Sequence, residues 1–178
     1  MRRVRRVGVI AVTALALASM TATTASATTI TSNGNPYSGP LTATANIANF
    51  NGIWNYYCQS SLSGNINSNG TGTINSLTFS TCQPWANCKA IVSGLPYSFN
   101  LNYTGPGRGQ GTINSNVTIN SGCTAAQCLA QAGPGVLTVR LNGTVLWIEG
   151  TLPNGLCANT RITAPYGVTT PANIGIQP

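Results

Sequence analysis

The amino-acid sequence predicts an all-β protein, a single antiparallel β-sandwich of about eight or nine strands stapled by disulfides. Short stretches in which apolar and polar residues alternate are separated by Gly, Pro and Asn, as in half-buried strands joined by turns. The chain of 178 residues contains six cysteines, an even number typical of a disulfide-stapled secreted domain. No long helical period is present, which also favours an all-β fold.

The first 27 residues predict a secretory signal peptide. A basic run at residues 2–6 is followed by an apolar run at residues 7–18 and by a small-residue cleavage site at residues 25–27. The apolar run is too short to span a membrane. We therefore expect cleavage after Ala27 and a mature protein that is extracellular, free or associated with the cell wall, and not in a membrane.

Residues 28–40 are expected to be a polar lead-in, residues 41–165 the β-sandwich domain, and residues 166–178 a loosely ordered tail. Within the domain, only residues 123–132 have a composition that suits a helical turn or two. Strands are predicted in eight segments, at residues 41–47, 53–62, 71–80, 95–103, 113–119, 136–141, 144–149 and 159–164. The segments at 95–103 and 113–119 are expected to pair as a long-looped hairpin, with Pro96 at a strand start or sheet edge.

A β-hairpin is predicted between Cys58 and Cys82. A three-residue loop at residues 69–71 places the two cysteines opposite each other. A two-residue Asn-Gly turn is the alternative, and it shifts the pairing by one residue and separates the cysteines. Leu77 and Phe79 have the opposite parity to the isoleucines of the hairpin, so either a bulge intervenes or both faces are partly buried.

The Asn-Gly pair at residues 142–143 predicts a second hairpin. With a two-residue turn there, Thr138 faces Trp147, and Arg140 and Glu149 lie on the same face of the hairpin. This face is an aromatic platform among hydrogen-bonding groups, which suits a sugar ring. In the competing interpretation the face packs against a second sheet and Trp147 is core, and this is favoured by the usual burial of large aromatic residues.

The six cysteines allow fifteen pairings from sequence alone. Spacing favours the set Cys58–Cys82, Cys123–Cys157 and Cys88–Cys128. The competing set is Cys82–Cys88, Cys123–Cys128 and Cys58–Cys157.

Composition argues against enzyme activity. The chain has no His and a single acidic residue, Glu149, so it lacks the paired carboxylates of a glycosidase and the base of a Ser or Cys nucleophile. Glu149 is expected to pair with an arginine or to be solvated. Metal and cofactor sites lack their usual ligands or motifs, so no cofactor is expected.

The mature chain carries four basic residues and one acid, which leaves a net charge of +3. These basic residues are scattered singly, so a nucleic-acid partner is not expected. They are Lys89, Arg108, Arg140 and Arg161.

Two functions remain for such a chain. The first is a secreted, non-catalytic structural or interaction protein of unknown partner in the extracellular space or cell envelope. The alternative is a carbohydrate-binding module that uses exposed Trp and Tyr with an Asn- and Thr-rich surface. Its candidate ligand surface consists of Trp85, which is expected in an exposed loop, and of Trp147, Arg140, Glu149 and Thr138.

Several short motifs occur in a fixed order. Cys58 precedes a Ser-Ser-x-x-Gly motif that ends at Gly64, and the later motifs are Leu-Thr-Phe-Ser-x-Cys at residues 77–82 and Gly-Leu-Pro-Tyr at residues 94–97. With the cysteines at 123 and 157, this order resembles a group of small secreted cysteine-containing β-proteins of actinobacteria. The resemblance implies a secreted bacterial β-protein without an assigned activity. It also implies that Cys88 and Cys128, which fall outside the four-cysteine pattern of the group, pair with each other.

Overall fold

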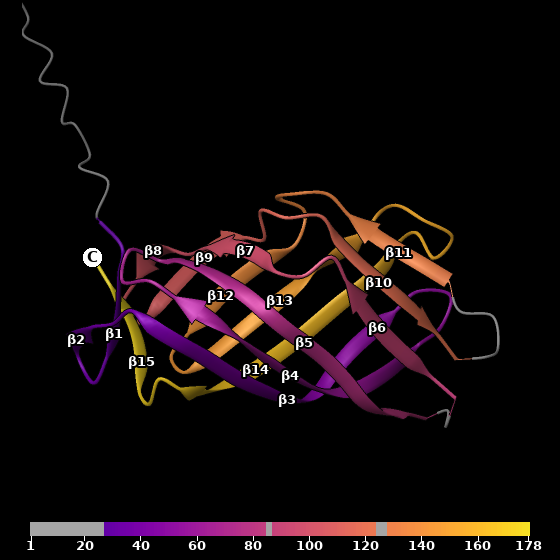
Figure 1. Cartoon of the computed structure of the whole chain (residues 1–178), viewed down its shortest axis with the longest axis horizontal. Helices are drawn as coiled ribbons and strands as arrows, with labels where there is room; N and C mark the ends of the chain where they lie inside the picture. Colours follow the sequence, from indigo (N-terminus) through magenta and orange to yellow (C-terminus); the bar gives the residue numbers. More distant parts are fainter. Residues whose placement is uncertain (1–26, 85–86, 124–127) are drawn as a thin grey trace, which may run out of the picture.

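A computed structural model describes residues 27–84, 87–123 and 128–178 of the chain. The described part is all-β and contains no helix, so none is long and apolar enough to cross a membrane. Its strands, labelled in Figure 1, are β1 (Thr29–Ser32), β2 (Asn35–Pro36), β3 (Gly39–Asn51), β4 (Tyr56–Ile66), β5 (Thr71–Gln83), β6 (Lys89–Ser93), β7 (Tyr97–Asn100), β8 (Asn102–Gly105), β9 (Arg108–Thr112), β10 (Val117–Gly122), β11 (Cys128–Ala132), β12 (Thr138–Asn142), β13 (Val145–Leu152), β14 (Thr160–Thr170) and β15 (Ile174–Gln177).

The main sheet has nine antiparallel strands in the order β7-β5-β4-β3-β14-β13-β12-β9-β8. Its two edge strands, β7 and β8, follow each other in the chain and are separated by Leu101 alone. The edges approach each other, because Phe99 bridges to Ile113 and the amide of Asn114 donates to the carbonyl of Ser98 at 2.8 Å. The sheet is therefore nearly closed, and its two walls pack face to face around one core, as the sandwich prediction requires.

Two small sheets complete the fold, and Figure 1 shows them toward opposite ends of the molecule. One has the order β11-β10-β6, and the other has the order β15-β1-β2. In the second, residues 29–32 pair with residues 174–177, and the isoleucines of both strands are buried. The expectation of a loosely ordered tail at 166–178 is therefore wrong, because this segment completes β14 and forms β15. Strand β1, in the polar lead-in at 28–40, supplies the partner of β15.

In the first predicted strand, residues 41–47, the expected buried positions are correct at the start and wrong at the end. Leu41, Ala43 and Ala45 are buried, as their alternation predicts. A bulge between Ala45 and Ala48 then places two residues of β3 opposite one of β4. Because a bulge reverses the parity of the residues beyond it, Ala48 turns inward and Ile47 is 48% exposed.

The hairpin of β4 and β5 is present, with a loop one residue earlier than predicted. Asn67 and Thr71 pair across residues 68–70, and Gly70 takes the left-handed conformation with φ of 83°. A bulge between Ile74 and Ser76 then reverses the parity of β5, so that Leu77 and Phe79 pack toward the core. The alternative of an intervening bulge is thereby confirmed.

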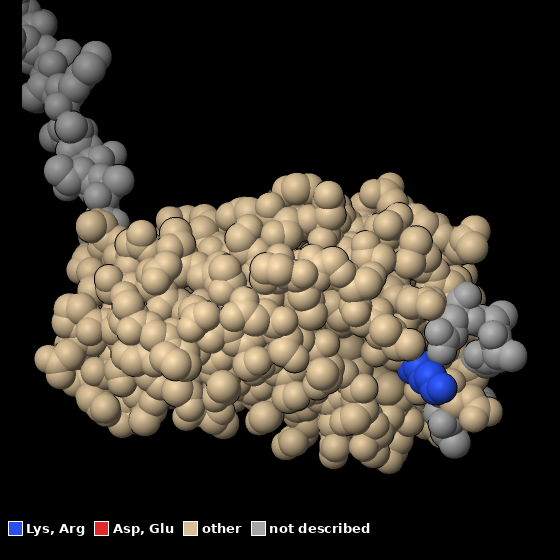
Figure 2. Space-filling model, viewed as in Figure 1, with Lys and Arg blue, Asp and Glu red and all other residues tan. Residues whose placement is uncertain are grey.

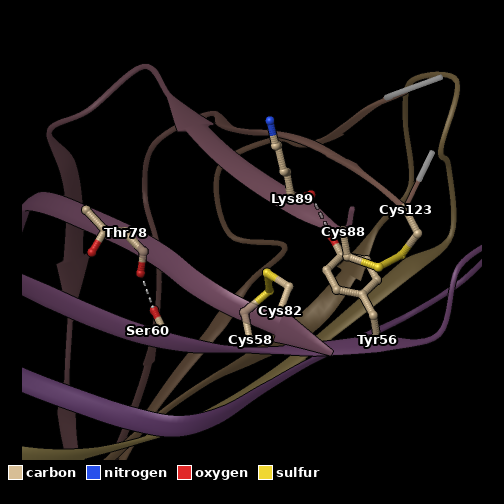
Figure 3. Close-up of a disulfide and its surroundings, with 8 residues drawn as sticks. All are labelled: Tyr56, Cys58, Ser60, Thr78, Cys82, Cys88, Lys89 and Cys123. Carbon is tan, nitrogen blue, oxygen red and sulfur yellow. Dashed lines mark hydrogen bonds between the residues drawn. A yellow bond between two sulfur atoms is a disulfide. The ribbon is translucent and has the colours of Figure 1, made fainter. Parts of the chain in front are cut away.

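A second bulge lies near the cysteine end of this hairpin, between the pairs Gln59–Ser80 and Tyr57–Gln83. Together the two bulges restore the register that faces Cys58 with Cys82, although the loop itself is shifted. The Cys58–Cys82 disulfide is present, so its prediction is confirmed (Figure 3).

The other two predicted disulfides, Cys123–Cys157 and Cys88–Cys128, are wrong, and so is the competing set. The bonds join Cys88 to Cys123 and Cys128 to Cys157. Pairing of β6 with β10 sets Lys89 opposite Gly122, and this brings together the cysteines next to them. Hydrogen bonds from residues 154 and 157 to β11 place Cys157 beside Cys128. All six cysteines are bonded, which is consistent with an oxidising, extracellular environment.

Two further expectations change. Residues 113–119 meet 95–103 at one antiparallel bridge, between Phe99 and Ile113, but do not form a hairpin with it. Strand β8 instead pairs with β9 across a tight turn, and Val117–Gly122 belongs to a different sheet. Pro96 does directly precede an edge strand, as predicted. The helical turn expected at 123–132 is wrong at Cys128–Ala132, which is strand β11, and residues 124–127 lie outside the described residues.

Candidate functional site

The candidate site is built on the hairpin of β12 and β13. Its turn consists of Gly143 and Thr144, because Asn142 pairs with Val145, and Gly143 has a φ of 58°. The turn therefore lies one residue later than predicted, and every pair is shifted by two positions. A shift of two preserves which face a side chain occupies. The predicted residues therefore still share one face, but each has a different cross-strand partner.

In the observed register Arg140 lies directly opposite Trp147, and Thr138 lies opposite Glu149. The predicted pair of Thr138 with Trp147 is therefore wrong, although all four residues share the outer face of the sheet. Trp147 is half-buried on that face and is not a core residue. The interpretation that placed it in the core is contradicted, because Trp147 is neither among the buried core residues nor among the partly buried side chains that pack against them.

A hollow of about 480 Å³ lies around this aromatic side chain. We call it the Trp147 pocket, and its polar lining comes from four strands, β8, β9, β12 and β13. The lining side chains include Thr104, Arg108, Gln110, Arg140, Asn142 and Trp147. The pocket thus combines one aromatic surface with hydroxyl, amide and guanidinium groups.

Strand pairing explains why these groups meet. Gln110 of β9 pairs with Arg140, which in turn pairs with Trp147. One row further along the strands, Arg108 pairs with Asn142. Two adjacent cross-strand rows therefore supply most of the pocket lining.

The side chain of Arg140 contacts two neighbours, Glu149 and Trp147. Its Nη2 donates to Oε1 of Glu149 at 2.7 Å, and its guanidinium carbon lies 6.0 Å from the centroid of the Trp147 ring. The side chains of Arg140 and Glu149 are 44% and 23% exposed, so the ion pair contributes little to stability but fixes an orientation. Glu149 is paired with an arginine, as expected from sequence.

A second, smaller hollow of about 340 Å³ lies over β3, β4 and β5 and is rich in hydroxyl groups. Ser60 carries its buried hydroxyl group, and the Oγ of Ser60 lies 2.8 Å from both the carbonyl oxygen of Thr78 and the hydroxyl of Tyr166. Burial raises the pKa of Tyr166 well above its ordinary value. Tyr166 therefore stays protonated near neutral pH and does not accept the proton of Ser60, so this pair lacks the base that a serine nucleophile needs.

The remaining sequence-based candidate, Trp85, lies outside the described residues. Figure 2 shows one face of the molecule with a single basic patch near one end and no acidic atoms, so this face is nearly uncharged. Among the described residues, no group of three or more His, Cys, Asp or Glu side chains could hold a metal ion.

Sequence reasoning missed Arg108, Gln110, Asn142 and Thr104 as site residues. The first two lie in the glycine-rich segment at 105–111, whose alternation is visible in the sequence. Their pairing with β12 is a contact between strands far apart in the chain, and no local pattern reports it.

Comparison with known protein families, curated proteins and solved structures finds no match to this chain. The resemblance to actinobacterial β-proteins therefore stays a prediction.

Proposed function

We propose that this chain is a secreted, non-catalytic binding protein whose ligand is a saccharide held in the Trp147 pocket. One observation carries the proposal: a half-buried indole borders an open hollow that is also lined by amide, hydroxyl and guanidinium groups. A sugar ring offers an apolar C–H face that packs on an aromatic surface, while its hydroxyls accept and donate hydrogen bonds.

The pocket supports binding better than hydrolysis. Glycoside cleavage uses two carboxylic acids on either side of the bond. The chain has one acidic residue, Glu149, and that residue is in an ion pair with Arg140. The polar groups around Trp147 are therefore suited to hold a saccharide but not to transfer protons during its cleavage.

The extracellular space or cell envelope is the proposed place of action. A leader of signal-peptide type and three disulfides support this location. Few charged residues also leave few sites for proteases that cut at Lys, Arg, Asp or Glu. A glycan of the envelope or its surroundings is the partner class that fits both the location and the pocket.

The test is a calorimetric titration of the purified, oxidised protein with a panel of soluble oligosaccharides, with pull-down on insoluble glycans in parallel. We expect saturable binding that Trp147→Ala weakens about fivefold or more, since stacking on an aromatic ring is worth about 1 kcal/mol or more. Trp54→Phe is the matched control, because Trp54 is partly buried against the core and does not line the pocket.

Unchanged affinity in Trp147→Ala, with the fold intact by circular dichroism, would overturn the assignment of the site. Absence of binding to every glycan in the panel would overturn the proposed function as a whole.

A further inference from the structure

We infer that the Trp147 pocket selects a saccharide that carries an anionic group, a carboxylate or a sulfate, and that Arg108 binds this group. The inference rests on the proposed function and adds the charge of the ligand and the residue that recognises it. The supporting observation is the distribution of charge around the pocket. Stacking of a sugar on Trp147 does not by itself require this charge.

Charge is rare in this chain, yet it gathers at the pocket. Two of the four basic residues of the described structure, Arg108 and Arg140, line it. The single acidic residue, Glu149, is in an ion pair with Arg140 and does not line the pocket. The pocket therefore keeps one positive charge that no ion pair of the described structure compensates, and the chain has no other acidic side chain to neutralise it.

The two arginines have different surroundings. Arg140 is engaged by Glu149 at 2.7 Å and packs over the indole, so it is already partnered. Arg108 is exposed at the start of β9, directly after the tight turn from β8, and forms no ion pair within the described residues. Its guanidinium offers five N–H donors in a planar fork, which matches the two oxygens of a carboxylate or sulfate.

Arg108 lies where it can contact a substituent of a sugar ring that is stacked on Trp147. Arg108 lies two residues along β9 from Gln110, and β9 is two strands away from β13. Strand geometry then separates the two backbone positions by about 12 Å. Because both side chains line one hollow, a sugar on the indole presents its outer substituents, or those of the next sugar, to the Arg108 guanidinium.

Asn142 strengthens this end of the pocket. It is the cross-strand partner of Arg108 and lines the same hollow, so its amide can donate to an oxygen that the arginine holds. The Trp147 end would thus bind the ring, and the Arg108–Asn142 end would bind its anionic group.

The experiment is calorimetric titration of the oxidised protein with an oligogalacturonate, with the neutral methyl ester of the same oligosaccharide, and with a sulfated oligosaccharide of similar length. We expect an acidic ligand to bind roughly ten- to a hundredfold more tightly than the methyl ester, as one charge-assisted interaction predicts. The preference should shrink as salt is raised. Comparing the uronate with the sulfated ligand identifies which anionic group is preferred.

Arg108→Gln should remove this preference, so that the acidic ligand binds no more tightly than the neutral ester does to the same variant. Arg161→Gln is the matched control, because Arg161 is an exposed arginine on β14 outside the pocket, and it should change neither affinity. Polyglutamate, an anion without sugar rings, should bind more weakly than the acidic oligosaccharide, by about fivefold or more, because it cannot stack on the indole.

Equal binding of acidic and neutral oligosaccharides would overturn the inference and leave the proposed function standing. So would acidic binding that Trp147→Ala abolishes and Arg108→Gln does not alter. Polyglutamate binding as tight as that of the uronate would overturn it too, since charge alone would then explain the result. Absence of binding to all three saccharides would count against both the inference and the proposed function.

Discussion

The guanidinium of Arg140 lies over the indole of Trp147, with 6.0 Å between the guanidinium carbon and the ring centroid. The two residues are direct cross-strand partners on β12 and β13. Glu149 lies two residues beyond Trp147 on the same strand and accepts from the same guanidinium at 2.7 Å. The aromatic surface of the pocket is therefore bordered by an arginine whose orientation is fixed by the only acid in the chain.

Glu149→Gln should weaken the binding of a neutral saccharide and the stability of the fold, each by a small amount. The ion pair is partly exposed, so its loss should lower the free energy of unfolding by less than about 1 kcal/mol. Arg140 would no longer be held in place by Glu149, and we expect the affinity for a neutral saccharide to fall by about two- to fivefold. Urea unfolding and ligand titration of the same variant measure the two effects. A loss of stability with unchanged affinity would show that Arg140 needs no anchor for binding.

Replacing Cys58 and Cys82 together by Ser should lower the free energy of unfolding by about 2 to 4 kcal/mol. The bond closes a loop between residues 24 apart, and removing it gives the unfolded chain more conformations. Urea denaturation under oxidising conditions measures the loss. Peptide mapping without reduction should also recover Cys88 linked to Cys123 and Cys128 linked to Cys157. A variant as stable as the parent would contradict the expected role of this bond.

Gly111→Ala should destabilise the protein by about 2 kcal/mol or more, because overpacking forces the backbone to move. A Cβ at residue 111 would collide with the carbonyl group of Asn100, at the place where the edges of the main sheet approach. Gly133→Ala is the control, since a Cβ there would have no neighbour within 4 Å. Thermal unfolding of both variants gives the comparison, and equal midpoints would mean that the two edges are not in close contact.

Stability should fall in alkaline solution. Burial raises the pKa of Tyr56 to about 12, and it also raises the pKa of Tyr97 and Tyr166. The protonated phenols are therefore favoured in the folded state, whereas in the unfolded chain these groups ionise near the ordinary value of 10.0. This contribution is complete below about pH 10 and is lost progressively as the pH rises from 10 toward 12.

Urea unfolding as a function of pH measures this loss. Between about pH 6 and 9 the curve should be nearly flat, because the chain has no His to titrate. Tyr56→Phe should reduce the slope above pH 10, since one ionising group is removed. An unchanged slope in that variant would show that Tyr56 ionises equally in both states.

Local alternation was enough to predict several features of the molecule. It placed Leu41, Ala43 and Ala45 in the core, and it placed Trp147 on the same face of its hairpin as Arg140 and Glu149. That face assignment survived an error of two positions in the hairpin register, because side chains repeat every two residues along a strand. The Cys58–Cys82 bond was also predictable, since it lies within one hairpin.

Other features depended on contacts between distant parts of the chain. The bulge that exposes Ile47 forms because β3 is paired with β4, and the bond of Cys88 to Cys123 follows from the pairing of β6 with β10. Arg108 joins the pocket only because β9 lies beside β12. A two-residue period records which face a side chain takes, but it carries no information about which strand lies alongside, and that choice is made by packing of the whole core.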